Sequence, residues 1–128
     1  MLNENAKKWV EALRSGKFKQ GKNFLHSIEG DTFCCLGVAC ELAVKEGIIP
    51  EPILKDTGTY VYGDENDSSN GFLPRAVKNW LGLGDVSGRL KMETGNTSLT
   101  NLNDSGTYDF NAIADIIEGR PEGLFESK

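Results

Sequence analysis

Long hydrophobic runs are absent from this sequence of 128 residues, and none approaches the length that a membrane-spanning helix needs. Residues 1–17 carry charges through the stretch that a signal peptide would keep apolar. We therefore expect a protein with neither a membrane anchor nor a signal peptide, located in the cytoplasm.

Cysteine is scarce, and Cys34, Cys35 and Cys40 all fall within one seven-residue stretch. Such crowding does not suit a disulfide framework and is typical of a reducing compartment. The cysteines also lack C-x-x-C spacing, and the single histidine, His26, has no partner at metal-ligand spacing. We expect free thiols, no metal site and no cofactor.

Positive charge is scarce outside the first segment. Residues 1–22 hold six Lys or Arg against two Asp or Glu, whereas the remaining residues hold 8 against 17. This acidic body argues against general nucleic-acid binding, because phosphate contacts supply most of the non-specific affinity. Glycine-rich phosphate-binding motifs are absent as well. The basic strip is either a solvated helix face or a local site for an anion or an acidic partner.

The spacing of apolar residues, with capping and stop residues at the ends, predicts helices and short strands. The expected helices are 4–14 (capped by Asn3), about 33–46 (capped by Asp31 or Thr32), 73–81 (with Pro74 in its first turn) and 110–118 (capped by Asp109). The expected strands are 24–28, TGTYVYG and RLKME. The length fits a single domain over residues 1–128. The irregular mixture predicts a compact α+β fold with about four helices and a small antiparallel sheet.

Four segments carry a pattern that covers nearly the whole chain: WVEALRSGKFKQG, FCCLGVACELA, LPRAVKNWLGL and SLTNLNDSGTYDFNAIADII. The most specific parts are FCCLGV and LND-x-G before the final helix. With these motifs the sequence resembles a family of small hypothetical proteins of tailed bacteriophages and prophages. That family often has leucine and aspartate where this chain has Ala39 and Glu41, and both differences are conservative. The resemblance implies an accessory protein made inside a host bacterium, and it carries over no activity.

The segment NLNDSGTYDFNA, residues 101–112, has the outline of a calcium-binding loop. With Gly106 at the sixth position, only Asp109 supplies a charged ligand, and Ala112 stands where the bidentate glutamate belongs. We therefore do not expect calcium binding. We interpret the segment as a turn with two exposed polar side chains, Asn103 and Asp104, followed by a helix cap.

The leading functional hypothesis is a non-enzymatic binding protein. It would recognise a host protein, as an antagonist of a host factor or of host defence, or it would sequester a small anionic metabolite or nucleotide. Lysine offers charge to an anion, and carboxamides can hydrogen-bond base or sugar groups. The candidate ligand-binding residues are Lys19, Gln20, Lys22, Asn103 and Asp104.

Two alternatives are open from the residues alone. A small cysteine-dependent hydrolase or transferase would use Cys34, near the start of a helix, with His26 eight residues upstream as its base. This pair lacks a recognised motif, and a cysteine within FCCLGVAC is more often a small buried hydrophobe. The other alternative is a structural module that assembles into homo-oligomers.

Overall fold

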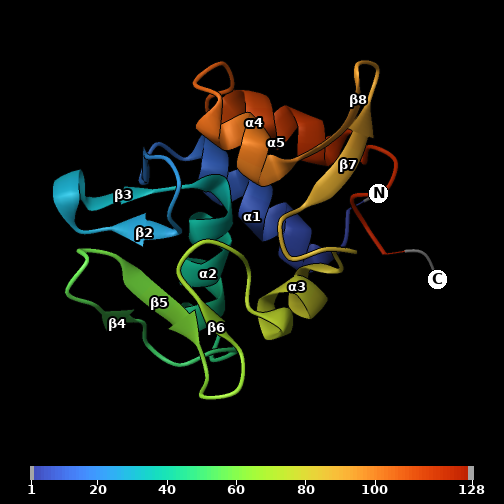
Figure 1. Cartoon of the computed structure of the whole chain (residues 1–128). Coiled ribbons are helices and arrows are strands. Elements are labelled where there is room, and N and C mark those ends of the chain that lie inside the picture. Colours follow the sequence, from blue (N-terminus) through green and yellow to red (C-terminus); the bar gives the residue numbers. More distant parts are fainter. Residues whose placement is uncertain (1, 127–128) are drawn as a thin grey trace.

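Figure 1 shows the computed structural model, which describes residues 2–126. Within this range the helices are α1 Glu4–Arg14, α2 Cys35–Lys45, α3 Arg75–Leu81, α4 Leu99–Asp104, α5 Phe110–Glu118 and the short 3-10 helix η1 Glu29–Asp31. The strands are β1 Lys19–Gln20, β2 His26–Ser27, β3 Thr32–Phe33, β4 Ile53–Leu54, β5 Tyr60–Gly63, β6 Ser68–Ser69, β7 Arg89–Met92 and β8 Gly95–Ser98. None of these helices is long and apolar enough to cross a membrane. Helices combined with small, mostly antiparallel sheets make an α+β fold, as the sequence predicts.

Helix α2 runs through the centre of the molecule (Figure 1), and every residue from Cys35 to Cys40 is buried. Gly37 allows this depth, because a Cβ there would lie 1.7 Å from the carbonyl oxygen of Leu25. The helix begins later than the sequence predicts, with Cys34 as its N-cap. The reason is that Thr32–Phe33 are held as strand β3 between β1 and β2.

Helices α1 and α5 pack along each other at one side of the core. The buried stripe of α1 has the spacing expected from the sequence: Ala6, Trp9, Val10 and Leu13. The Asn3 cap is confirmed, since its Oδ1 accepts a hydrogen bond from Ala6 N at 2.8 Å. The indole Nε1 of Trp9 donates to Cys35 O at 2.9 Å, which ties α1 to the first turn of α2.

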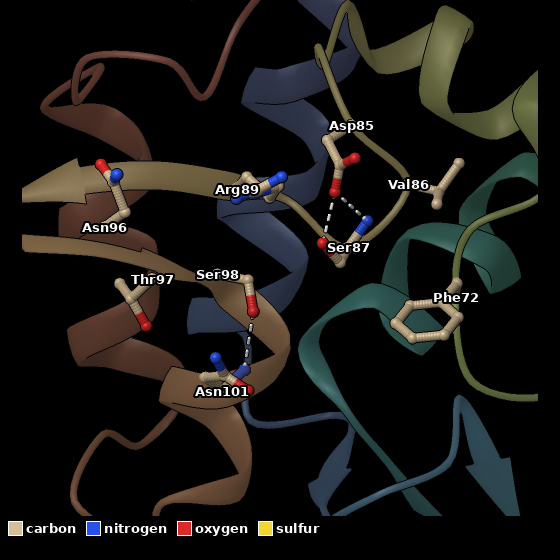
Figure 2. A pocket seen from close by; sticks show the side chains of 9 residues that line it. All are labelled: Phe72, Asp85, Val86, Ser87, Arg89, Asn96, Thr97, Ser98 and Asn101. Carbon is tan, nitrogen blue, oxygen red and sulfur yellow. Dashed lines mark hydrogen bonds between the residues drawn. The ribbon is translucent and has the colours of Figure 1, made fainter.

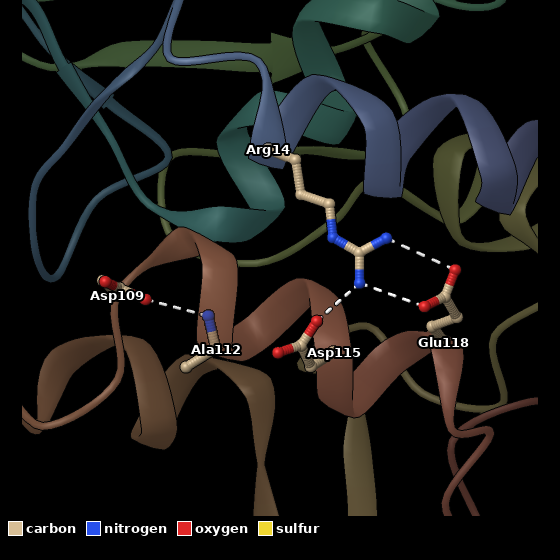
Figure 3. A network of polar contacts seen from close by, with 5 residues as sticks. All are labelled: Arg14, Asp109, Ala112, Asp115 and Glu118. Carbon is tan, nitrogen blue, oxygen red and sulfur yellow. Dashed lines mark hydrogen bonds and ion pairs between the residues drawn. The ribbon is translucent and has the colours of Figure 1, made fainter.

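The outer edge of the α1–α5 contact is polar (Figure 3). Arg14, in the last turn of α1, pairs with Asp115 and Glu118 of α5. At the start of α5, Asp109 Oδ1 accepts a hydrogen bond from Ala112 N at 2.8 Å, which confirms the second expected cap.

The sheets are smaller than expected. β3 pairs in parallel with β1 and antiparallel with β2, so this sheet is mixed. The strand predicted over 24–28 shrinks to His26–Ser27. Leu25 and His26 are both buried while Phe24 and Ile28 are exposed, so the alternation of a half-buried strand is not kept. The cause is a hydrogen bond of 2.8 Å from Leu25 N to Asn70 O, outside the sheet.

Strand β7 confirms the strand expected at RLKME, and the short helix α4 takes up the first residues of the segment interpreted as a turn, residues 101–112. β7 pairs with β8 over four residues, from Arg89 opposite Ser98 to Met92 opposite Gly95. Ser98 Oγ then accepts a hydrogen bond from Asn101 N at 3.1 Å and caps α4. This arrangement places LND of the phage-like motif on a helix rather than in a loop.

Candidate functional site

Three of the five candidate ligand-binding residues meet at one surface pocket of about 330 Å³, which we call the Lys22 pocket. Its lining residues are Gln20, Gly21, Lys22, Asn103, Gly106, Thr107, Tyr108 and Asp109. Lys19 does not line it; its Nζ lies near Gly30, 3.8 Å from the position of a Cβ there. Asp104 does not line it either, since its Oδ1 accepts a hydrogen bond from Asn23 N at 2.9 Å.

Asn103 is buried in the floor of the Lys22 pocket, with 1% of its surface exposed, so the expectation of an exposed turn residue is corrected. Its Oδ1 accepts hydrogen bonds from Cys35 N at 3.1 Å and from Gln20 Nε2 at 3.0 Å. Its Nδ2 donates to Gly21 O at 2.8 Å and to Asp104 Oδ1 at 3.1 Å. A carboxamide has two donors and two acceptor positions. Asn103 therefore has none left for a ligand and instead fixes the pocket wall.

The carboxamide of Gln20 also has part of its hydrogen-bonding capacity in use. Its Nε2 donates to Tyr108 O at 2.9 Å as well as to Asn103, which leaves Oε1 as its open polar atom. Lys22 is exposed and forms no ion pair within residues 2–126. Its ammonium lies over the turn at Gly106, where φ is +80° and a Cβ would lie 3.1 Å from Lys22 Nζ. The group that remains free to bind an anion is therefore the Lys22 ammonium.

The thiol and the imidazole of the alternative enzyme hypothesis do not form a pair. Cys34 is 3% exposed, and burial raises the pKa of its thiol to about 11, although backbone hydrogen bonds from Gly37 and Leu36 lower it. His26 Nδ1 lies 3.0 Å from the Tyr62 hydroxyl, so this nitrogen is engaged away from the thiol. A cysteine nucleophile needs a base within hydrogen-bond reach. The described residues place no free imidazole nitrogen there.

His26, which is buried, is instead one member of a chain of polar contacts that ends at the exposed Asp31. Its Nε2 lies 2.6 Å from Asp31 Oδ1, and Tyr62, which contacts its Nδ1, donates to Glu41 Oε2 at 2.6 Å. Burial, reinforced by the Glu41 hydrogen bond, raises the pKa of Tyr62 well above its ordinary value, so the phenol stays protonated.

The His26 ring is also stacked between two aromatic rings. The Phe33 ring lies on one face, with centroids 3.9 Å apart and planes at 17°, and the Tyr60 ring lies 4.2 Å away at 14°. Together with the polar chain, this stacking joins β2, β3 and β5 to α2. The arrangement is a structural link between sheets, and it accounts for a buried histidine without any reaction.

A second pocket, of about 450 Å³, was not expected from the sequence, and we call it the Arg89 pocket (Figure 2). Its lining residues are Phe72, Asp85, Val86, Ser87, Arg89, Asn96, Thr97, Ser98 and Asn101. Asp85 Oδ2 accepts hydrogen bonds from Ser87 N, at 2.9 Å, and from Ser87 Oγ. Burial raises the pKa of Asp85, but these hydrogen bonds and nearby cations outweigh it and hold the pKa below its ordinary value. The carboxylate is therefore ionised near neutral pH.

The fold and its pockets define a small α+β protein with two polar surface sites. Among residues 2–126, no cluster of His, Cys, Asp and Glu could hold a metal ion. The chain belongs to the family described as Domain of unknown function (DUF8296), whose model matches residues 1–121. No curated protein and no solved structure matches the chain.

Proposed function

We propose that this chain is a phage-type accessory protein that acts by binding in the cytoplasm of a host bacterium. Its ligand is a small anionic metabolite, held at the Lys22 pocket. The observation that carries the proposal is the convergence of two distant segments, with Gln20 and Lys22 on one side and Gly106–Asp109 on the other. A single free ammonium in the lining fits a ligand with one compact anionic group.

The rigidity of the pocket supports binding. Asn103 joins the segment at Gln20–Gly21 to helix α2, and its hydrogen bonds hold the pocket in one shape before a ligand arrives. Binding to a preformed site avoids the entropy cost of ordering loops. The same contact connects the two most specific phage-like motifs, because Cys35 belongs to FCCLGV and Asn103 to LND. Both motifs thus contribute to the support of the pocket.

Binding without catalysis is favoured by the buried thiols and by His26, whose two ring nitrogens both contact other side chains. The acidic body agrees with a small ligand rather than a nucleic acid. A self-assembling structural module would instead show a stable oligomer in size-exclusion chromatography with light scattering, and no gain in stability with any anion.

The test is a thermal-unfolding screen against inorganic phosphate, carboxylate metabolites, nucleotides and cyclic nucleotides. A ligand at about 100 times its Kd stabilises the folded state by ~2.7 kcal/mol. We expect at least one of these anions to raise the Tm of the native protein and of Lys19→Gln, but not that of Lys22→Gln. Lys19 is the matched control because it is an exposed lysine near the pocket but outside its lining. A screen without any shift, or one in which every shift persists in Lys22→Gln, would refute the proposal.

A further inference from the structure

Some polar side chains of the Arg89 pocket have open hydrogen-bonding groups, whereas Ser87 and Ser98 are engaged within the protein. The Arg89 guanidinium and the carboxamides of Asn96 and Asn101 form no hydrogen bond within the part of the chain that the structure describes. Asp85 uses Oδ2 for both bonds from Ser87, which leaves Oδ1 open. Free donors and acceptors that converge on one cavity are the usual means of fixing a small ligand.

Strand β8 adds main-chain groups to these side chains. Leu99 N donates to Gly88 O, and this bond determines which residue pairs of the β7–β8 hairpin are hydrogen-bonded to each other. In an antiparallel pair, alternate residues turn their N–H and C=O groups away from the partner strand. In this register Asn96 and Ser98 are such residues, so their N–H and C=O groups point away from β7, along the open edge of the hairpin. Both residues line the pocket, so their N–H groups are further donors there.

The chemistry changes in order along the pocket (Figure 2). Asn96 and Arg89 stand toward one end, where donors and positive charge suit an anion. Asp85 and Ser87 come next, where an ionised carboxylate suits hydroxyl donors. Phe72, whose side chain is 49% exposed, stands at the other end. An aromatic ring in that position suits stacking with a planar ring of any base type.

We propose that the Arg89 pocket binds a 5′-nucleoside monophosphate. The phosphate contacts Arg89 and the free donors of β8, the ribose hydroxyls face Asp85, and the base stacks on Phe72. The order of these three groups matches the order of phosphate, sugar and base in the ligand. A volume of about 450 Å³ lies in the range of small-molecule sites.

The Arg89 pocket is separate from the Lys22 pocket, so the test of one proposal does not decide the other. The experiment is a titration of the isotope-labelled protein with AMP, followed by calorimetry and by the NMR signals of the Asn96 and Asn101 side-chain amides. We expect both amides to shift. Adenosine and ribose 5-phosphate should each bind at least about tenfold more weakly than AMP, because each lacks one of the charged or stacking contacts.

Two variants and one control localise the binding. Arg89→Gln should weaken AMP about tenfold or more, because it removes the charge-assisted hydrogen bonds to phosphate. Lys91→Gln removes the same charge from the same strand, outside this pocket, and should change AMP affinity less than about twofold. Phe72→Leu should weaken AMP severalfold and leave ribose 5-phosphate unchanged.

Three results would overturn the inference: no binding of AMP, equal weakening by Arg89→Gln and Lys91→Gln, or loss of AMP binding in Lys22→Gln alone. The last result would place the nucleotide in the Lys22 pocket and so support the proposed function while removing this one. Binding that responds to Arg89→Gln and ignores Lys22→Gln supports the Arg89 pocket, whatever the outcome of the anion screen.

Discussion

The side-chain oxygen of Asn103 accepts a hydrogen bond of 3.1 Å from the backbone N–H of Cys35, 68 residues earlier in the chain. The first N–H groups of a helix have no partner within it and are usually satisfied by the N-cap side chain. Cys34, the N-cap of α2, forms no such bond. Asn103 therefore caps the central helix from another element, and the start of α2 depends on the position of α4.

Replacing this cap should be costly. We predict that Asn103→Ala lowers the free energy of unfolding by about 2–4 kcal/mol, because it leaves Cys35 N, Gly21 O and Gln20 Nε2 without their partner. Urea unfolding followed by circular dichroism measures the loss. Asn101→Ala is the control on the same helix, where the side chain is exposed, and should cost less than about 0.5 kcal/mol. Equal costs for the two variants would show that Asn103 is not the cap that α2 needs.

The sequence was sufficient wherever local signals agreed. The stripe of α1 behind Asn3 and the apolar face of α5 behind Asp109 combine helical spacing with a capping residue, and both helices are where they were predicted. Helix α3 likewise ends at Gly82, whose φ of +78° a glycine adopts without strain.

Helix α4 and both pockets depend on contacts between segments that are far apart in the sequence. α4 has six residues, LTNLND, rich in weak helix formers, and it is held by the Ser98 cap and by Asn103. Gln20 and Lys22, two of the predicted ligand-binding residues, line one pocket, but nothing local in the sequence shows that the hydrogen bonds of Asn103 are all made within the protein. The Arg89 pocket could not be found at all, because its residues come from separate segments without a shared spacing.

The polar chain through His26 yields a second prediction. Tyr62→Phe removes the hydroxyl that lies between His26 Nδ1 and Glu41 Oε2, leaving both atoms without this partner in a buried site. We expect a loss of about 1–3 kcal/mol in the free energy of unfolding. Tyr60→Phe is the matched control, because its hydroxyl forms no hydrogen bond within residues 2–126 and its ring still stacks on His26. If Tyr60→Phe lowers the free energy of unfolding as much as Tyr62→Phe does, the hydrogen bonds of the Tyr62 hydroxyl are not what stabilises this site.

The thiols should be inert in the folded protein. A pKa of about 11 for Cys34 leaves roughly one thiol in a thousand ionised at pH 8, and burial raises the pKa of Cys35 and Cys40 well above their ordinary values. We predict no labelling by iodoacetamide at pH 8 in native buffer, and labelling of all three cysteines in urea, as measured by intact mass. Rapid modification of Cys34 in the native state would revive the cysteine-enzyme hypothesis and contradict the assignment of these thiols to the core.

The ion pairs of Arg14 give a pH-dependent prediction (Figure 3). Hydrogen bonds and the charge of Arg14 hold the pKa of Glu118 below its ordinary value of 4.5. A carboxyl whose pKa is lowered by folding stabilises the folded state above the unfolded pKa, and this contribution disappears as the pH falls through the folded value. Arg14→Gln should therefore be less stable than the native protein at pH 7, with a smaller deficit than Asn103→Ala, since the pair is exposed.

The difference between Arg14→Gln and the native protein should shrink as the pH falls through the lowered pKa of Glu118, because the carboxyl then becomes protonated in both proteins. It should also shrink in 1 M salt, at a Debye length of ~3 Å. Lys17→Gln is the control for charge alone, because Lys17 is exposed and pairs with no carboxylate in the described residues. Chemical unfolding of Arg14→Gln and Lys17→Gln at a series of pH values distinguishes the loss of the ion pairs from the loss of one charge. A deficit that persists at low pH would assign the role of Arg14 to packing of its aliphatic stem against α5 rather than to its charge.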